Sequence, residues 1–298
     1  MDDDPKFSVD LEVGARGHVA FLKEVHSRGL SLERPSAESL RRYDTLWLNM
    51  VASLDPDAKD GLLVPPLDIA WVWHCHRLAP DAYERACLAR FGRLLNNPEA
   101  AFQFQSEPQS SSDGCESTRH LWEAMYPEEP FFSSAGPSQS ITVHDGLIEG
   151  FDVAGSAERQ MTFLWQVSGP RFNDDSFLRE GVVNYWRFLT LMRLHPSAFL
   201  VPTYQIDLMW HTHILASTEA YQRDCMDITG FKHAPDHDDS VNDRSSPETK
   251  LNASTKSTKD MWREAFGVEF AVEGGMYRGE PPSEYWSPDW VSGAWCEW

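Results

Sequence analysis

Two short segments of the chain carry paired histidines, each in the pattern Trp-His-x-His-x-Leu. The first pair is His74 and His76, and the second pair is His211 and His213. Imidazole is the commonest protein ligand of transition metals, and it also serves as a general acid or base near neutral pH. Asp207 precedes His211 by four residues, which places a carboxylate on the same face of a helix. These residue types indicate either a metal site or acid–base chemistry.

The spacing within each pair limits which side chains could bind one ion. On a helix, residues i and i+2 point about 200° apart, so His74 and His76 cannot readily share an ion. One histidine from each segment plus one carboxylate is the economical metal site, and we expect His74, Asp207 and His211. The first segment has Ala70 where the second has Asp207. Such a difference is expected if only one half of the duplication carries the site. The sequence requires no cofactor, but this donor set suits iron or zinc.

A packing role is the alternative, and we weigh it above metal binding and far above metal-free catalysis. His76 and His213 lie on the same helical faces as Trp73 and Trp210, which we expect to be structural. Each imidazole is therefore expected in the core, bonded to a carbonyl or an acid across the interface of the repeats. As metal ligands, His76 and His213 are the second choice.

Two weaker candidates lie close to the histidine segments. Residues 233–239 read His-Ala-Pro-Asp-His-Asp-Asp and offer metal-binding side chains, but a charged loop is the simpler interpretation. Cys75 lies between two histidines, yet Thr212 replaces it in the second segment, so a buried inert thiol is expected. The chain has no phosphate-binding glycine loop and no G-x-S-x-G, which argues against nucleotide-binding and hydrolase functions.

The histidine segments belong to an internal duplication. A Phe-Leu pair, a tyrosine, the histidines and a Thr-x-x-x-Trp motif recur in the same order roughly 140 residues apart. The first residues of these landmarks, histidines aside, are Phe21, Tyr43 and Thr118 in one copy and Phe163, Tyr185 and Thr258 in the other. We predict repeats at 8–130 and 150–272, followed by an aromatic, proline-rich tail at 273–298.

Helices are expected to position the motifs. Apolar side chains recur every three or four residues, as at Val182, Tyr185 and Leu189. Prolines at 65 and 202 suit the first turn of a helix, so both histidine segments are predicted to be helical, although residues 67–73 also alternate as a strand would. The predicted fold is mainly α, with two pseudo-symmetric helical repeats packed together and long polar loops. Of the polar stretches 105–117 and 232–258, the second is expected to be a mobile excursion.

Composition indicates a soluble globular protein, with 41% hydrophobic and 12% aromatic residues in 298. No apolar run is long enough to cross a membrane, and the acidic start does not resemble a secretory signal. Five cysteines without a C-x-x-C pair favour reduced thiols, so a cytoplasmic location is expected. The formal net charge of −20 argues against a nucleic-acid partner, and a protein partner is expected. The oligomeric state is left open.

The paired segments resemble the two signature motifs of the glycine-rich domain-containing protein family, known from plants and fungi. The resemblance covers roughly residues 8–275 and rests on Trp73-His74-Cys75-His76 and Trp210-His211-Thr212-His213. The family's domain has no established biochemical activity to carry over. Plant members add an RNA-recognition-like segment and a glycine-rich tail, and they are discussed in growth and stress responses. Residues 274–298 are instead rich in aromatics and proline, so no nucleic-acid role is carried over.

The sequence therefore predicts a cytosolic binding or regulatory module with mainly structural histidines at the repeat interface. The alternative is an iron- or zinc-dependent enzyme with a composite His/Asp site at the seam of the repeats. The large rings of the tail are expected to pack back on the repeats rather than to form a binding patch. These rings are Tyr277, Tyr285, Trp286, Trp290, Trp295 and Trp298.

Overall fold

Helices account for most of the chain that the computed structural model describes. The described residues are 5–30, 34–54, 63–96, 101–106, 113–133, 146–237 and 249–276. The prediction of a mainly α fold is confirmed, since the sheet within these ranges is one antiparallel pair, β1 (Leu147–Ile148) and β2 (Phe151–Asp152). No helix of these ranges combines the length and apolar character that crossing a membrane requires. The tail aromatics from Tyr277 onward lie outside the described residues.

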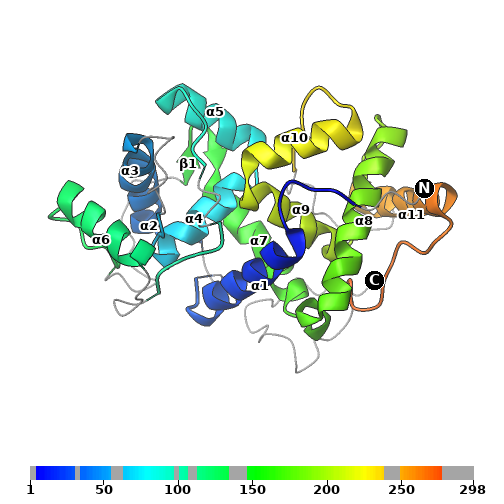
Figure 1. Cartoon of the computed structure of the whole chain (residues 1–298), viewed down its shortest axis with the longest axis horizontal. Helices are drawn as coiled ribbons and strands as arrows, with labels where there is room; N and C mark the ends of the chain where they lie inside the picture. Colours follow the sequence, from blue (N-terminus) through cyan, green and yellow to red (C-terminus); the bar gives the residue numbers. More distant parts are fainter. Residues whose placement is uncertain are drawn as a thin grey trace. The chain divides into compact units, whose positions relative to one another are not determined.

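The chain divides into two compact units, which we call the N-terminal unit and the C-terminal unit. The N-terminal unit spans residues 21–160, and the C-terminal unit combines residues 1–20 with residues 161–298. Both division points fall inside helices, namely α1 (Leu11–Ser27) and α7 (Val153–Val167). The first part of each of these helices therefore belongs to one unit and the last part to the other (Figure 1).

The N-terminal unit buries large aromatic rings among short helices. Ser36 begins the first of its complete helices, because its hydroxyl accepts a hydrogen bond from the backbone N–H of Ser39 as an N-cap. Trp47, Trp71 and Trp122 are among the largest fully buried side chains. Besides the strand pair, the complete elements are α2 (Ala37–Arg41), the π-helical turn η1 (Arg42–Trp47), α3 (Leu48–Ser53), α4 (Leu67–Arg77), α5 (Pro80–Phe91) and α6 (Asp113–Met125).

The C-terminal unit is arranged around a long central helix, α8, which contacts both α9 and α10 (Figure 1). Trp165, Trp262, Tyr185 and Tyr221 are fully buried in this unit. Its complete elements are the 3-10 turn η3 (Pro170–Asn173), α8 (Asp175–Leu194), α9 (Tyr204–Ala216), α10 (Thr218–Thr229) and α11 (Lys250–Phe266).

The two histidine segments form α4 and α9, so the prediction that they are helical is confirmed. Pro66 occupies the N-cap position of α4. Thr203 caps α9, where its hydroxyl accepts from the backbone N–H of Ile206 over 3.3 Å. Because α9 is helical, His211 and His213 point to different sides of it and enter different environments.

Equivalent contacts recur in the two units at positions that the duplication pairs. The backbone N–H of Val64 donates to Thr118 Oγ1 over 2.9 Å, and that of Val201 donates to Thr258 Oγ1 over 3.1 Å. In each case the threonine of the Thr-x-x-x-Trp motif anchors the chain just before the histidine helix. These contacts support the predicted duplication, while the superposition of the two repeats stays a prediction.

The polar stretch 232–258 differs from the mobile excursion that was predicted. From Lys250 onward its residues form the first turns of α11, where Leu251 and Thr255 are buried. Its first residues, 232–237, contact α9 and α10 through Pro235 and His237. For residues 250–258 the prediction is wrong, because only one narrow stripe of α11 faces the core and the average polarity of the stretch conceals it. Residues 238–248 lie outside the described residues.

Candidate metal centre

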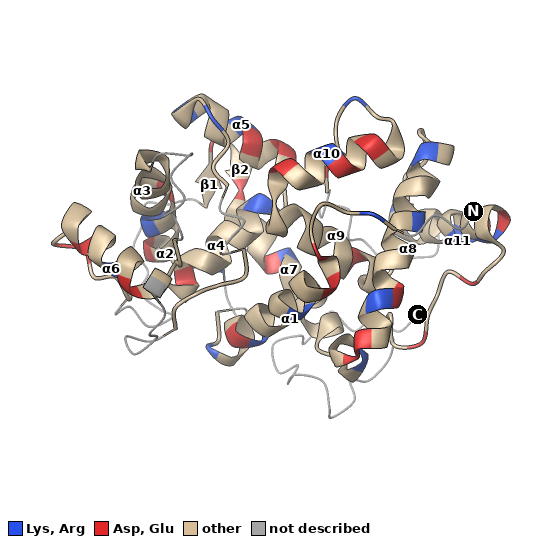
Figure 2. Cartoon of the chain, viewed as in Figure 1, with Lys and Arg blue, Asp and Glu red and all other residues tan. Residues whose placement is uncertain are grey.

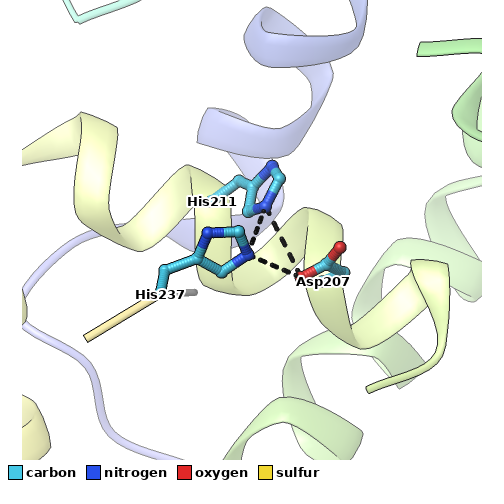
Figure 3. A group of neighbouring side chains, drawn as sticks. All are labelled: Asp207, His211 and His237. Atoms are coloured by element: carbon cyan, nitrogen blue, oxygen red, sulfur yellow. Dashed lines mark hydrogen bonds and ion pairs between the residues drawn. The ribbon is translucent and has the colours of Figure 1, made fainter. Parts of the chain in front are cut away.

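Asp207 and His211 lie one turn apart on α9, on the shared face that their spacing predicted. The distance from His211 Nε2 to Asp207 Oδ1 is 3.5 Å (Figure 3). The His211 side chain is 1% exposed and the Asp207 side chain 16% exposed. The pair therefore lies at the edge of the core, and Asp207 is the more exposed of the two.

His237 brings a third donor atom to this pair. Its Nε2 lies 2.9 Å from His211 Nε2 and 3.4 Å from Asp207 Oδ1 (Figure 3). The His237 side chain is 10% exposed. One ligand atom from each residue lies within 4.8 Å of the other two. The three residues thus form a compact set of two imidazole nitrogens and one carboxylate oxygen, which we call the metal centre.

The separations between the three donor atoms fit a single small cation. They are 2.9 Å between the two Nε2 atoms, 3.5 Å from His211 to Asp207 and 3.4 Å from His237 to Asp207. The circle through these atoms has a radius of about 1.9 Å, so a point just off their plane lies about 2.0 to 2.1 Å from each, as zinc–nitrogen and zinc–oxygen bonds require.

The Asp207 carboxylate faces the two imidazole nitrogens at 3.4 and 3.5 Å, longer than a good hydrogen bond. Its Oδ1 atom is buried and accepts no hydrogen bond from the residues that the structure describes. A buried polar atom without a partner costs about 1 to 3 kcal/mol, and more when the group is charged. A cation bound to Oδ1 would remove this cost, so the donor set favours a bound metal.

Aromatic packing holds both imidazoles of the metal centre in place. The His211 ring lies against Phe163, with ring centres 4.2 Å apart. The His237 ring meets Trp210 edge to face at 5.1 Å, and it meets the His211 ring edge to face at 4.4 Å. This packing restricts the rotation of each ring, which lowers the entropy that an ion must overcome to order its ligands.

His74, the predicted third ligand, belongs to the N-terminal unit. Its ring stacks on Trp71 at 5.2 Å and lies 5.3 Å from the ring of Phe21. The duplication pairs His74 with His211, but α4 carries Ala70 where α9 carries the carboxylate Asp207. The set of His74, Asp207 and His211 stays a prediction, whereas the structure groups Asp207 and His211 with His237.

His76 and His213 are fully buried, as their helical faces predicted. Each presents Nδ1 to a tyrosine hydroxyl, at 2.9 Å for Tyr43 and His76 and at 3.1 Å for Tyr185 and His213. Burial lowers the pKa of His76 to about 3. Burial also lowers the pKa of His213, although Asp224, 3.3 Å from His213 Nε2, acts in the opposite direction. Both imidazoles are therefore neutral at pH 7.

A phenylalanine from the segment before a long helix covers each of these histidines. Phe7, just before α1, stacks on Tyr185 and meets His213 edge to face at 5.1 Å. Phe151, just before α7, stacks on His76 at 5.7 Å. Each His–Tyr pair is thus covered by a phenylalanine ring that is distant in the sequence but belongs to the same unit.

His237 is the residue that sequence reasoning assigned to a charged loop rather than to the site. The signal that could have found it is the run His233-Ala-Pro-Asp-His237, which has metal-binding side chains without the serine content of a linker. No periodic pattern connects this run to α9, so its contact with His211 could not be read from the sequence.

Comparison with known proteins places the chain in a family. A sequence model described as glycine-rich domain-containing protein-like matches residues 82–224. Glycine-rich domain-containing protein 1 of Arabidopsis thaliana is 35% identical over 291 residues, which cover 93% of this chain and 34% of that protein. Glycine-rich domain-containing protein 2 of the same plant is 35% identical over 286 residues, covering 92% and 35%. The chain thus spans about a third of the length of these curated relatives. No solved structure matches it.

Proposed function

The chain belongs to the family of glycine-rich domain-containing proteins, and we propose that it is a cytoplasmic binding or regulatory module that holds a first-row transition metal ion. The family name describes a composition and states no reaction, so the proposal rests on geometry. The observation that carries it is the convergence of Asp207, His211 and His237 within 4.8 Å. Five cysteines without a C-x-x-C pair support the cytoplasmic location.

Zinc and iron(II) are the ions that the donor set favours. Two imidazole nitrogens and one carboxylate oxygen are intermediate ligands, which zinc and iron(II) accept, whereas magnesium and calcium prefer oxygen ligands throughout. Two of the three donors, Asp207 and His211, are on a helix, and the third, His237, follows another helix of the same unit. An ion would therefore link α9 to the segment that follows α10.

His76 and His213, one histidine from each segment, are assigned a packing role. His76 and His213 are buried, each is within hydrogen-bond distance of a tyrosine hydroxyl, and each has a lowered pKa. A general base needs access to substrate, which these buried rings lack, and burial lowers the pKa of both imidazoles. Their position supports a structural role inside each unit.

A protein is the proposed partner of the module. Acidic and basic residues both occur along helices α8 and α10 (Figure 2). Nucleic-acid binding depends on a concentrated basic surface, and the formal net charge of −20 acts against it. The mixed charges of these helices support recognition of another protein instead.

A metal-dependent enzyme is the second candidate function. The observation that favours it is the number of protein ligands among the described residues, where Asp207, His211 and His237 supply three. Structural zinc sites take four protein ligands, whereas catalytic sites take three and leave a position for water or substrate. An enzyme would use that open position at the edge of the core.

Metal analysis of the full chain, purified without chelator, tests the proposal. We expect about one equivalent of zinc or iron in the native protein, and less than about 0.1 equivalent in Asp207→Ala and His237→Ala, since each loses a ligand. His233→Ala is the matched control, because His233 is an exposed histidine of the same segment. Native protein without metal, even after incubation with Zn²⁺ or Fe²⁺, would overturn the proposal.

The same protein separates the two candidate functions. Loaded with Co²⁺, the metal centre should show visible absorption that reports its coordination. A change of that spectrum on adding azide would reveal an open position and favour the enzyme. A spectrum that azide leaves unchanged would favour the binding or regulatory module.

A further inference from the structure

We infer that Tyr221 and Trp210 are positioning residues of the metal centre, which hold the segment after α10 so that His237 reaches the ion. The inference rests on the proposed function. Neither side chain supplies a ligand atom to the group of Asp207, His211 and His237. Tyr221 acts through its hydrogen bond to the backbone of Pro235, and Trp210 acts through its contact with the His237 ring.

A chain of hydrogen bonds connects α9 to the segment that carries His237. The indole N–H of Trp210 donates to the Tyr221 hydroxyl over 2.9 Å, and that hydroxyl donates to the backbone carbonyl of Pro235. Two residues later, the edge-to-face contact at 5.1 Å sets the His237 ring against Trp210 itself. One indole therefore anchors both the backbone before His237 and its ring.

The hydroxyl of Tyr221 is suited to this task because it acts as donor and acceptor at once. The side chain is fully buried, and burial raises the pKa of Tyr221 well above 10. The hydroxyl therefore keeps its proton and donates to Pro235 at every physiological pH. Phenylalanine would preserve the ring but would lose both hydrogen bonds.

The N-terminal unit contains the same anchor, and among its described residues no comparable group of metal-binding side chains is found. The indole N–H of Trp73 donates to the Tyr83 hydroxyl over 2.9 Å, and that hydroxyl donates to the carbonyl of Leu95 over 2.8 Å. In this unit α4 carries Ala70 in place of a carboxylate. The Trp–Tyr hydrogen bond is thus common to both units, and in the C-terminal unit it holds the segment that carries the proposed ligand His237.

The length of the anchored segment distinguishes the two units. Both α5 and α10 end at a left-handed glycine, Gly92 and Gly230. The anchored carbonyl follows the first glycine by three residues, at Leu95, and the second by five, at Pro235. The longer segment lets the chain return along α9 far enough to place His237 beside His211.

Metal affinity of matched variants tests the inference. We expect Tyr221→Phe to weaken Zn²⁺ binding by the full chain about 10- to 100-fold, the range found when the supporting partners of metal ligands are removed. Tyr83→Phe loses the corresponding two hydrogen bonds in the other unit, and it should bind Zn²⁺ as the native protein does. Equal Zn²⁺ affinity of Tyr221→Phe and native protein would overturn the inference, and so would an equal loss in Tyr83→Phe.

A second measurement needs no metal and separates this inference from the proposed function. In chelator-treated protein, diethyl pyrocarbonate should acylate His237 several-fold faster in Tyr221→Phe than in the native chain, because the ring is no longer held against Trp210. Tyr83→Phe should leave the rate at His237 unchanged. Unchanged acylation in Tyr221→Phe would reject the positioning role. Faster acylation in a protein that binds no Zn²⁺ would keep the positioning role and reject the metal centre.

Discussion

The Nε2 atoms of His211 and His237 lie 2.9 Å apart, although one residue belongs to α9 and the other follows α10. Their rings meet at 87°, so the two nitrogens approach each other without stacking of the ring faces. Two imidazole nitrogens this close need either a proton between them or a common cation. With the carboxylate of Asp207 adjacent to both, a divalent ion would satisfy all three donors at once.

Zn²⁺ should stabilise the chelator-treated protein against unfolding. A ligand that binds only the native state at 100 times its dissociation constant adds about 2.7 kcal/mol, which should raise the unfolding temperature by several degrees. Thermal unfolding followed by circular dichroism with and without Zn²⁺ measures this shift. His237→Ala should abolish it, and a shift that survived in this variant would assign the ion to another site.

His76→Ala should lower the free energy of unfolding by about 3 kcal/mol, because it leaves a cavity and deprives the Tyr43 hydroxyl of its partner. His213→Ala should have a similar effect through Tyr185. Urea denaturation measures both changes. His120→Ala, at an exposed histidine, is the control and should stay within about 0.5 kcal/mol. A loss of unfolding free energy within about 0.5 kcal/mol in His76→Ala would argue against a packing role for His76.

Acidification should destabilise the protein between pH 6.5 and pH 3. Burial lowers the pKa of His18 and of His76 to about 3, whereas an unfolded imidazole titrates near 6.5. The unfolded state therefore binds more protons in this window, and stability falls as the pH falls. Between pH 7 and pH 5 each imidazole should remove about 2 kcal/mol. Urea denaturation at both pH values should show a smaller difference in His76→Gln than in the native chain.

Asp224 should contribute stability that is lost in stronger acid. Burial by itself raises the pKa of Asp224, but hydrogen bonds from His213 and from Ser8 outweigh it and lower the pKa to about 2. A carboxyl with a depressed pKa stabilises the fold above its unfolded pKa near 3.9, and this contribution is lost as the pH falls toward 2. Asp224→Asn should remove that part of the pH dependence in acid titrations followed by fluorescence.

Ser8→Ala should reproduce part of the effect of Asp224→Asn on acid stability. It removes the hydroxyl that donates to Asp224 Oδ1 but keeps the backbone N–H that donates to Oδ2. The pKa of Asp224 should then rise part of the way, and acid destabilisation should begin at a higher pH than in the native chain. An acid transition that is identical in native protein, Ser8→Ala and Asp224→Asn would contradict this account.

Periodicity along the chain was enough to predict the helices that carry the histidines. Apolar residues at helical spacing report which face of a local segment is buried, and this reasoning correctly placed His76 and His213 in the core. The i, i+4 spacing of Asp207 and His211 likewise determined that they share one face of α9. Each of these inferences depends only on residues within a few turns of one another.

The third member of the metal centre depends on tertiary structure alone. His237 lies in a segment without periodicity, and its position follows from the contacts of Pro235 with Tyr221 and of its own ring with Trp210. The contact of Phe7 with His213 also depends on tertiary structure, since the two residues are distant in the sequence. Such contacts join residues that share no local sequence pattern, because they depend on how helices pack and bring distant parts of the backbone together.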